Sequence, residues 1–154
     1  MAIMNPYNYS KPKTFIATEP LKAVKPIENS RANPKNDKMD QYLENRIISA
    51  KPEELTLMLY EGLVKFIKKA QINLDTKNIE QVNYNVMRAQ AIVDELRNTL
   101  NMEIPLSESM DSMYEYLSYK LVMANVDKNP LTFDEALIVA EDFRETWKEA
   151  FGLK

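Results

Sequence analysis

The sequence predicts an all-α fold, and three features carry this prediction. Apolar residues recur at three- and four-residue spacing through four stretches after residue 52, which is the period of an amphipathic helix. Short breaker segments separate these stretches, so consecutive helices are expected to pack as antiparallel neighbours. Only two glycines occur in 154 residues, whereas the turns of an all-β domain need more. We therefore expect an up-down-up-down four-helix bundle in one domain.

The first helix is expected over about residues 52–75. Pro52 is well tolerated in a first helical turn, and Glu53 and Glu54 have the charge that a helix N-terminus favours. An apolar seam then runs through Leu55, Leu59, Gly62, Phe66, Ala70 and Leu74. The polar segment 75–78 ends this pattern.

Three further helices are expected over about residues 79–101, 107–127 and 132–151. The second has a seam of Ile79, Val82, Val86, Ala89, Val93, Leu96 and Leu100. The third has Met110, Met113, Leu117, Leu121 and Ala124 at core spacing. In the fourth, Thr132 and Glu135 predict a capping box, and the core face is Ala136, Ala140, Phe143, Trp147 and Ala150.

Residues 1–41 differ in composition from the rest of the chain. They hold five of the eight prolines, many Asn and Lys residues, and apolar residues without a regular period. Such a segment cannot bury enough apolar surface to offset its ordering entropy. We expect residues 1–41 to form an extended, largely flexible N-terminal segment and residues 42–154 to form the bundle. The alternative is that the apolar patches around Phe15 and Leu21 dock on the bundle or on a partner.

The composition excludes several classes of function. The chain has no cysteine and no histidine, which removes thiol and imidazole catalysis and zinc thiolate sites. Gly62 and Gly152 are too few for a GxGxxG or P-loop motif. Adjacent carboxylates such as Glu141 and Asp142 point in different directions on a helix. We therefore expect no enzymatic activity, no metal and no cofactor.

Charge and hydropathy narrow the expected partners and location. Residues 41–154 carry 13 basic and 19 acidic side chains, so nucleic acid is not an expected partner. No run approaches the roughly 18 apolar residues of a membrane span. The N-terminus lacks the pattern of a secretory signal. These observations predict a cytoplasmic protein without membrane insertion.

Several helices carry a second apolar series beside the expected seam. Its tyrosines and methionines suit a surface that repacks around a peptide. One interpretation is a broad core stripe, and another is an apolar groove that binds an amphipathic or extended peptide. As a set these residues favour the groove, with candidate partner-binding residues Leu57, Tyr60, Val64, Ile67, Tyr84, Met87, Tyr116, Tyr119 and Met123. An alternative function is a structural bundle that uses this second face for homodimerisation.

The run from Tyr42 to Gly62 resembles the signature of the flagellar secretion chaperones of the FliS family. The similarity lies in Ala50-Lys51-Pro52, in Leu55 and in Met58-Leu59-Tyr60-Glu61-Gly62, although serine is common in the family where Lys51 stands. Asn5-Pro6-Tyr7 and Phe143–Ala150 also resemble family segments. Some thirty residues rich in Pro, Lys and Asn are inserted between the N-terminal motif and the signature.

The resemblance implies a cytoplasmic chaperone that binds the C-terminal segment of flagellin, prevents premature polymerisation and helps deliver flagellin to the type III export gate. The chaperone is expected to be a monomer or a weak dimer when free. The resemblance also implies an N-terminal tyrosine and an aliphatic residue, and the register from Pro52 favours Tyr42 over Tyr7 and Tyr9, with Ile47 as the aliphatic residue. We expect Tyr42 and Ile47 to cover part of the apolar groove. The alternative role is a hydrophobic staple at the helix entry.

Overall fold

The computed structural model describes residues 4–7 and 34–154. These residues form five helices and no strand: α2 (Pro34–Ser49), α3 (Pro52–Asp75), α4 (Ile79–Asn98), α5 (Pro105–Asp127) and α6 (Pro130–Phe151). The predicted all-α class is confirmed. Helices α3 to α6 begin and end within three residues of the predicted bounds, and α2 is an additional helix.

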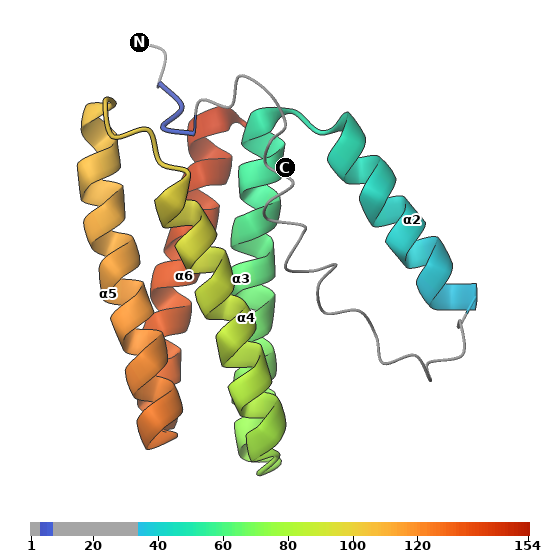
Figure 1. Cartoon of the computed structure of the whole chain (residues 1–154), viewed down its shortest axis with the longest axis vertical. Helices are drawn as coiled ribbons and strands as arrows, with labels where there is room; N and C mark the ends of the chain where they lie inside the picture. The colour runs from blue at the N-terminus through green and yellow to red at the C-terminus, as the bar shows by residue number, and fades with distance from the viewer. Residues whose placement is uncertain (1–3, 8–33) are drawn as a thin grey trace.

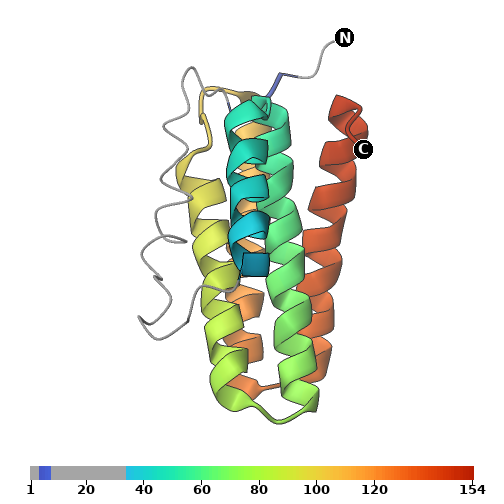
Figure 2. The same ribbon diagram turned by 90° about the vertical axis from the view of Figure 1, so that its right-hand side faces the viewer.

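The four long helices, α3 to α6, stand side by side, and the chain direction reverses from each to the next (Figures 1 and 2). Helix α3 packs against α4 and α6, and α5 packs against the same two helices, so the apolar faces meet in one shared core. Helix α2 joins the start of α3 and diverges from it toward its own N-terminus (Figure 1). None of the helices in the described part of the chain is both long and apolar enough to cross a bilayer.

Proline and asparagine set where the long helices begin. Pro52, Pro105 and Pro130 each lie in a first helical turn, where the missing N–H costs no hydrogen bond. The predicted capping box of Thr132 and Glu135 is wrong, because α6 begins two residues earlier. Its N-cap is Asn129, whose Oδ1 accepts a hydrogen bond from the Leu131 amide at 3.0 Å.

The core face of α3 is turned away from the predicted seam. The buried apolar residues of α3 are those of the second apolar series together with Leu63 and Ala70. Leu59, Phe66 and Leu74 are only partly buried at the edge of the core. The physical reason is that α3 has two neighbours, α4 and α6, and the stripe between them faces the core. Gly62 lies on the α4 side, where an added Cβ would come within 3.3 Å of Ile92 Cδ1.

The predicted flexible segment over residues 1–41 differs from the structure at both of its described ends. Helix α2 begins at Pro34, so residues 34–41 are helical. Residues 4–7, here called the N-terminal tetrad, lie against one end of the long helices, and Tyr7 is fully buried. The prediction for residues 8–33 lies outside the described residues.

Candidate partner-binding surface

Five aromatic residues fill the end of the core nearest the N-terminal tetrad: Tyr7, Tyr60, Tyr114, Phe143 and Trp147, here called the aromatic cluster. The Phe143 ring stacks on Tyr60 and Tyr114, with centroids 5.5 and 4.7 Å apart. Trp147 meets Tyr7 and Tyr60 edge to face, at 5.8 Å in each case. Such geometries add stabilisation beyond the buried area, so this end of the core is firmly packed.

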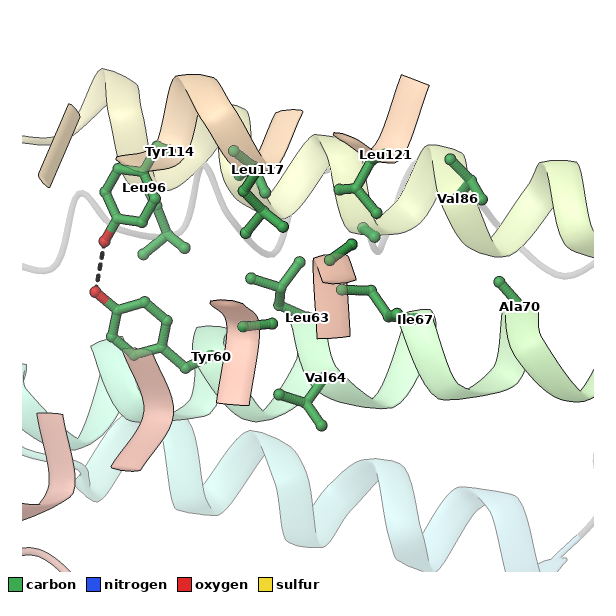
Figure 3. Close-up of a cluster of buried hydrophobic side chains, with 14 of the residues drawn as sticks. Tyr60, Leu63, Val64, Ile67, Ala70, Val86, Leu96, Tyr114, Leu117 and Leu121 are labelled. Atoms are coloured by element: carbon green, nitrogen blue, oxygen red, sulfur yellow. Dashed lines mark hydrogen bonds between the residues drawn. The ribbon is translucent and has the colours of Figure 1, made fainter. Parts of the chain in front are cut away.

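Hydrogen bonds join the three phenols of the aromatic cluster. The Tyr7 hydroxyl lies 2.6 Å from that of Tyr114, which lies 2.5 Å from that of Tyr60 (Figure 3 shows the second pair). The carbonyl oxygen of Leu96, in α4, accepts from Tyr7 at 2.9 Å. Burial first, and then the neighbouring phenols, raise the pKa of Tyr114 well above its ordinary value. The Tyr114 hydroxyl therefore stays protonated and available for hydrogen bonding.

Backbone and amide groups anchor the rest of the tetrad. The Pro6 carbonyl accepts from the Asn101 amide at 3.0 Å. Asn5 Oδ1 accepts from the Tyr7 amide at 2.7 Å, and its Nδ2 donates to Glu53 Oε1 at 3.4 Å. Glu53 also offers its carbonyl oxygen to Trp147 Nε1 at 2.8 Å. The tetrad thus connects the start of α3, the α4–α5 loop and the aromatic cluster.

The candidate residues on α3 are buried rather than exposed. Tyr60 and Ile67 lie in the core on the side of α3 that faces α4 and α5 (Figure 3), and Val64 and Leu57 are buried as well. On α3, the second apolar series is therefore part of a broad core stripe and does not line an open groove. A partner would reach these four side chains only after a rearrangement.

The candidate residues on α4 and α5 lie at the surface. Tyr84, Met87, Tyr116 and Tyr119 are exposed, and Met123 is half-buried. Lys128 Nζ binds Asn83 Oδ1 at 2.8 Å and Asn125 Oδ1 at 2.7 Å, which brings the start of α4 beside the end of α5. Several exposed apolar side chains lie on α4 and α5 close in sequence to Asn83 and Asn125. We call them the α4–α5 row: Tyr84, Met87, Tyr119, Val122 and Val126.

Comparison with known proteins decides the family. A family model described as flagellar protein FliS matches residues 35–153. The chain belongs to the FliS family. It is 42% identical over 109 residues to the flagellar secretion chaperone FliS of Bacillus subtilis, which covers 71% of this chain and 82% of that protein. It is 32% identical over 110 residues to the flagellar secretion chaperone FliS of Campylobacter jejuni, with 70% and 86% covered.

The FliS match extends over all the long helices and nearly all of α2, which agrees with the resemblance seen in the Tyr42–Gly62 run. The structure nevertheless does not agree with the expectation that Tyr42 covers an apolar groove. Its side chain is 64% exposed on α2, and Ile47 on the same helix is half-buried. The tyrosine buried against the long helices is Tyr7, so the register argument that preferred Tyr42 is wrong on this point. The sequence signal that could have indicated Tyr7 is Asn5-Pro6, because the Asn5 side chain accepts a hydrogen bond from the Tyr7 amide and forms a turn there.

A second exposed strip on this FliS-family chain runs between α5 and α6, and sequence reasoning found only part of it. Lys120 Nζ pairs with Glu135 Oε2 at 2.5 Å and lies 5.4 Å from the centre of the Tyr116 ring. The exposed apolar residues flanking this pair form the α5–α6 row: Met113, Tyr116 and Ile138. Met113 was expected in the core but is exposed, and Tyr114 is buried in its place. Met110 and Leu117 are buried as predicted, and the residue between them that continues the inward face is Tyr114, four residues after Met110 and three before Leu117.

Proposed function

We propose that this protein is a cytoplasmic export chaperone that binds the C-terminal segment of flagellin. In this role it keeps flagellin from polymerising too early and helps deliver it to the type III export gate. The protein acts by stoichiometric binding, without catalysis and without a cofactor. The four long helices serve as an antiparallel up-down-up-down bundle that holds the binding surface rigid. The names of the relatives as flagellar secretion chaperones support the flagellar role.

One observation carries the binding proposal: α4, α5 and α6 expose apolar side chains on outer faces although their inner faces already fill the core. Exposed apolar patches of this kind mark interaction surfaces. Methionine adapts to the partner, and tyrosine remains compatible with water when the partner is absent. An amphipathic client helix laid along the α4–α5 and α5–α6 rows would bury them.

The client must order itself on binding, and this requirement sets the expected thermodynamic signature. Coupled folding and binding costs about 2–5 kcal/mol of the gross interaction energy, so the rows must bury ample apolar area. We expect a saturable 1:1 complex with a synthetic flagellin C-terminal peptide in calorimetric titrations of the full chain. The heat-capacity change should be clearly negative, and affinity should depend only weakly on salt. A steep loss of affinity at moderate salt would contradict an apolar binding surface.

A pair of matched variants tests the location of the surface. Met87→Ser combined with Tyr119→Ser removes two exposed apolar side chains from the α4–α5 row, and we expect roughly tenfold weaker peptide binding. Ile72→Ser is the control, because Ile72 is equally apolar and exposed but lies on α3. Equal losses in both variants would show that peptide binding is not confined to the rows.

Helix α2 is proposed to contribute to the same function. Tyr42 is too exposed to cover the rows, so we propose that Tyr42 and Ile47 contact the client directly. The double change Tyr42→Ala and Ile47→Ala should then weaken peptide binding and leave the thermal midpoint nearly unchanged. Unchanged affinity with a lower midpoint would favour the hydrophobic staple instead.

A homodimer built on the exposed rows is the competing function. Analytical ultracentrifugation of the full chain separates the two proposals. A monomer, or a dimer that dissociates on dilution and on adding peptide, agrees with the chaperone role. A dimer that is stable to dilution and refuses the peptide would favour the structural role.

A further inference from the structure

Sulfur occurs in this chain only as the thioether of methionine. The sequence has nine methionines and no cysteine. A peroxide that reaches the protein therefore finds no thiol to oxidise, and the methionine side chains are the groups that it converts reversibly. The positions of the methionines in the fold decide what such a conversion does to the protein.

Each of the two apolar rows exposes one methionine. Met87, in the α4–α5 row, is 64% exposed, and Met113, in the α5–α6 row, is 45% exposed. Their neighbours in the rows are tyrosine, valine and isoleucine side chains, which mild treatment with peroxide leaves unchanged. The thioethers of Met87 and Met113 are thus the oxidisable points of the two rows.

The sulfur atom that belongs to the core is shielded from solvent. Met110 lies one helical turn before Tyr114 on the inward face of α5 and is 8% exposed. Among the methionines in the described ranges it is the one buried in the core, whereas Met58 and Met123 are half-buried and the others are exposed. Oxidation confined to the exposed positions therefore alters the rows and leaves the core packing intact.

We propose that Met87 and Met113 are oxidation sites that switch off client binding. The inference rests on the proposed function, since it adds regulation to the same apolar surface. Each thioether sulfur attacks one oxygen of hydrogen peroxide, the O–O bond breaks, and that oxygen is transferred to form a sulfoxide. The sulfur is oxidised by two electrons, and the peroxide is reduced to water.

A sulfoxide at either position opposes burial under a client. The thioether is flexible and apolar, whereas the sulfoxide is polar and chiral. Its oxygen accepts hydrogen bonds from water in the free protein, and the apolar face of a client helix has no donor to replace them. Because Met87 and Met113 already face solvent, the free bundle accommodates the same change. Oxidation should therefore lower client affinity and leave stability unchanged.

The modification is reversible, which gives it the character of a switch. Two methionine sulfoxide reductases, one for each epimer, return the sulfoxide to the thioether. A thiol reductant supplies two electrons and two protons, and the oxygen leaves as water. Since the chain has no cysteine, the thiol has no disulfide of this protein to act on. Recovery of binding under these conditions therefore identifies methionine as the oxidised group.

The test uses the full chain, treated with hydrogen peroxide that is removed before the client peptide is added. Peptide mapping by mass spectrometry should find sulfoxide at Met87 and Met113 well before Met110. At a dose that spares Met110, circular dichroism should show an unchanged thermal midpoint. Calorimetric titration with the synthetic flagellin C-terminal peptide should show roughly tenfold weaker binding, which the two reductases with dithiothreitol should restore.

Matched variants locate the effect. Met87→Leu with Met113→Leu removes both thioethers and keeps apolar bulk, so whatever affinity this variant has before peroxide should be the same after it. Met4→Leu with Met102→Leu removes two thioethers that are 67% and 58% exposed outside the rows. This control should lose affinity on oxidation as the wild type does.

Three results would overturn the proposal. The first is equal affinity before and after oxidation when mass spectrometry confirms both sulfoxides. The second is an equal loss in the Met87→Leu and Met113→Leu double variant, which would place the effect at other residues. The third is a lower thermal midpoint, which would place it in the fold. Failure of the untreated chain to bind the peptide would instead remove the proposed function, and this regulation with it.

Discussion

Two pieces of the N-terminal region lie beside the same long helices, and they are held very differently. The tetrad is four residues long, yet Tyr7 is 0% exposed and its hydroxyl, amide and neighbouring carbonyl are all hydrogen-bonded. Helix α2 has 16 residues, yet Tyr42 is 64% exposed. A cleft of about 630 Å³, lined by Arg46, Leu57 and Phe151 among others, lies where α2 joins α3.

The difference shows that segment length does not decide how firmly a segment is anchored. The tetrad fits a space whose walls bind the Tyr7 hydroxyl, the Pro6 carbonyl and the Asn5 side chain, and Asn5 in turn binds the Tyr7 amide. Helix α2 satisfies its own backbone and brings to α3 the Arg46–Glu61 ion pair, an exposed contact that water screens. Local opening should therefore be easy for α2 and difficult for the tetrad. Substitutions in either segment can break or sharpen this contrast.

The largest expected effect is that of Tyr7→Ala. Removing a buried aromatic ring and its hydroxyl should lower the free energy of unfolding by about 3 kcal/mol. Tyr42→Ala is the matched control and should change it by less than about 0.5 kcal/mol. Urea denaturation followed by circular dichroism measures both values. Comparable effects at the two positions would contradict the contrast between the tetrad and α2.

Alkaline pH should act through the aromatic cluster. The pKa of Tyr114 is raised in the folded state by burial, so the unfolded chain loses its phenolic proton first. The free energy of unfolding is therefore unaffected by this phenol below the ordinary tyrosine pKa of 10.0, and it falls as the pH rises above that value. Thermal midpoints measured on both sides of that pH should fall steeply in the wild type. Tyr114→Phe should reduce the fall, and an unaltered pH profile would exclude this phenol as its source.

Tyr7→Phe separates the hydrogen bonds of the tetrad from its packing. The ring remains, but the Leu96 carbonyl and the Tyr114 hydroxyl each lose a buried partner. We expect a loss of about 1–2 kcal/mol, smaller than for Tyr7→Ala. Denaturant unfolding gives this number. A neutral result would mean that packing of the ring alone retains the tetrad.

The smallest expected effect is that of Arg46→Gln. Both partners of the Arg46–Glu61 pair are well over a third exposed, so solvent screening limits the loss of global stability to about 0.5 kcal/mol or less. Hydrogen exchange should nevertheless show faster exchange in α2 and an unchanged rate in α3. Strong global destabilisation would show that α2 is a firm part of the bundle.

The long helices could be predicted from sequence because their evidence is local. Apolar spacing placed α3 to α6 closely, and proline at the first turn placed the start of α3. Helix α2 was missed because Pro34–Ser49 is polar and its few apolar residues lie among charges that mask their period. Its existence depends on helical propensity and on the α3 junction, neither of which creates an apolar face.

The candidate surface was harder to predict, since it depends on rotation about each helix axis. Helix α3 is apolar on several sides, so spacing alone could not decide whether Tyr60 or Leu59 faces inward; contact with both α4 and α6 decides it. In α4 the polar faces are clearer, and Tyr84 and Met87 were placed correctly at the surface. The burial of Tyr7 depends on acceptors 89 and 107 residues away, which no local pattern reveals.

The position of Trp147 gives the molecule its own optical reporter. It is the sole tryptophan of the chain, its indole N–H is bonded to the Glu53 carbonyl, and the Tyr7 ring lies 5.8 Å away. Withdrawal of the tetrad would let water reach the indole, shift its emission to longer wavelength and relieve any quenching by the adjacent phenols. Steady-state and stopped-flow fluorescence of the unlabelled protein can therefore follow this one movement in real time. Neither Glu53 nor Tyr7 belongs to α2, so motions of α2 should leave the Trp147 emission unchanged.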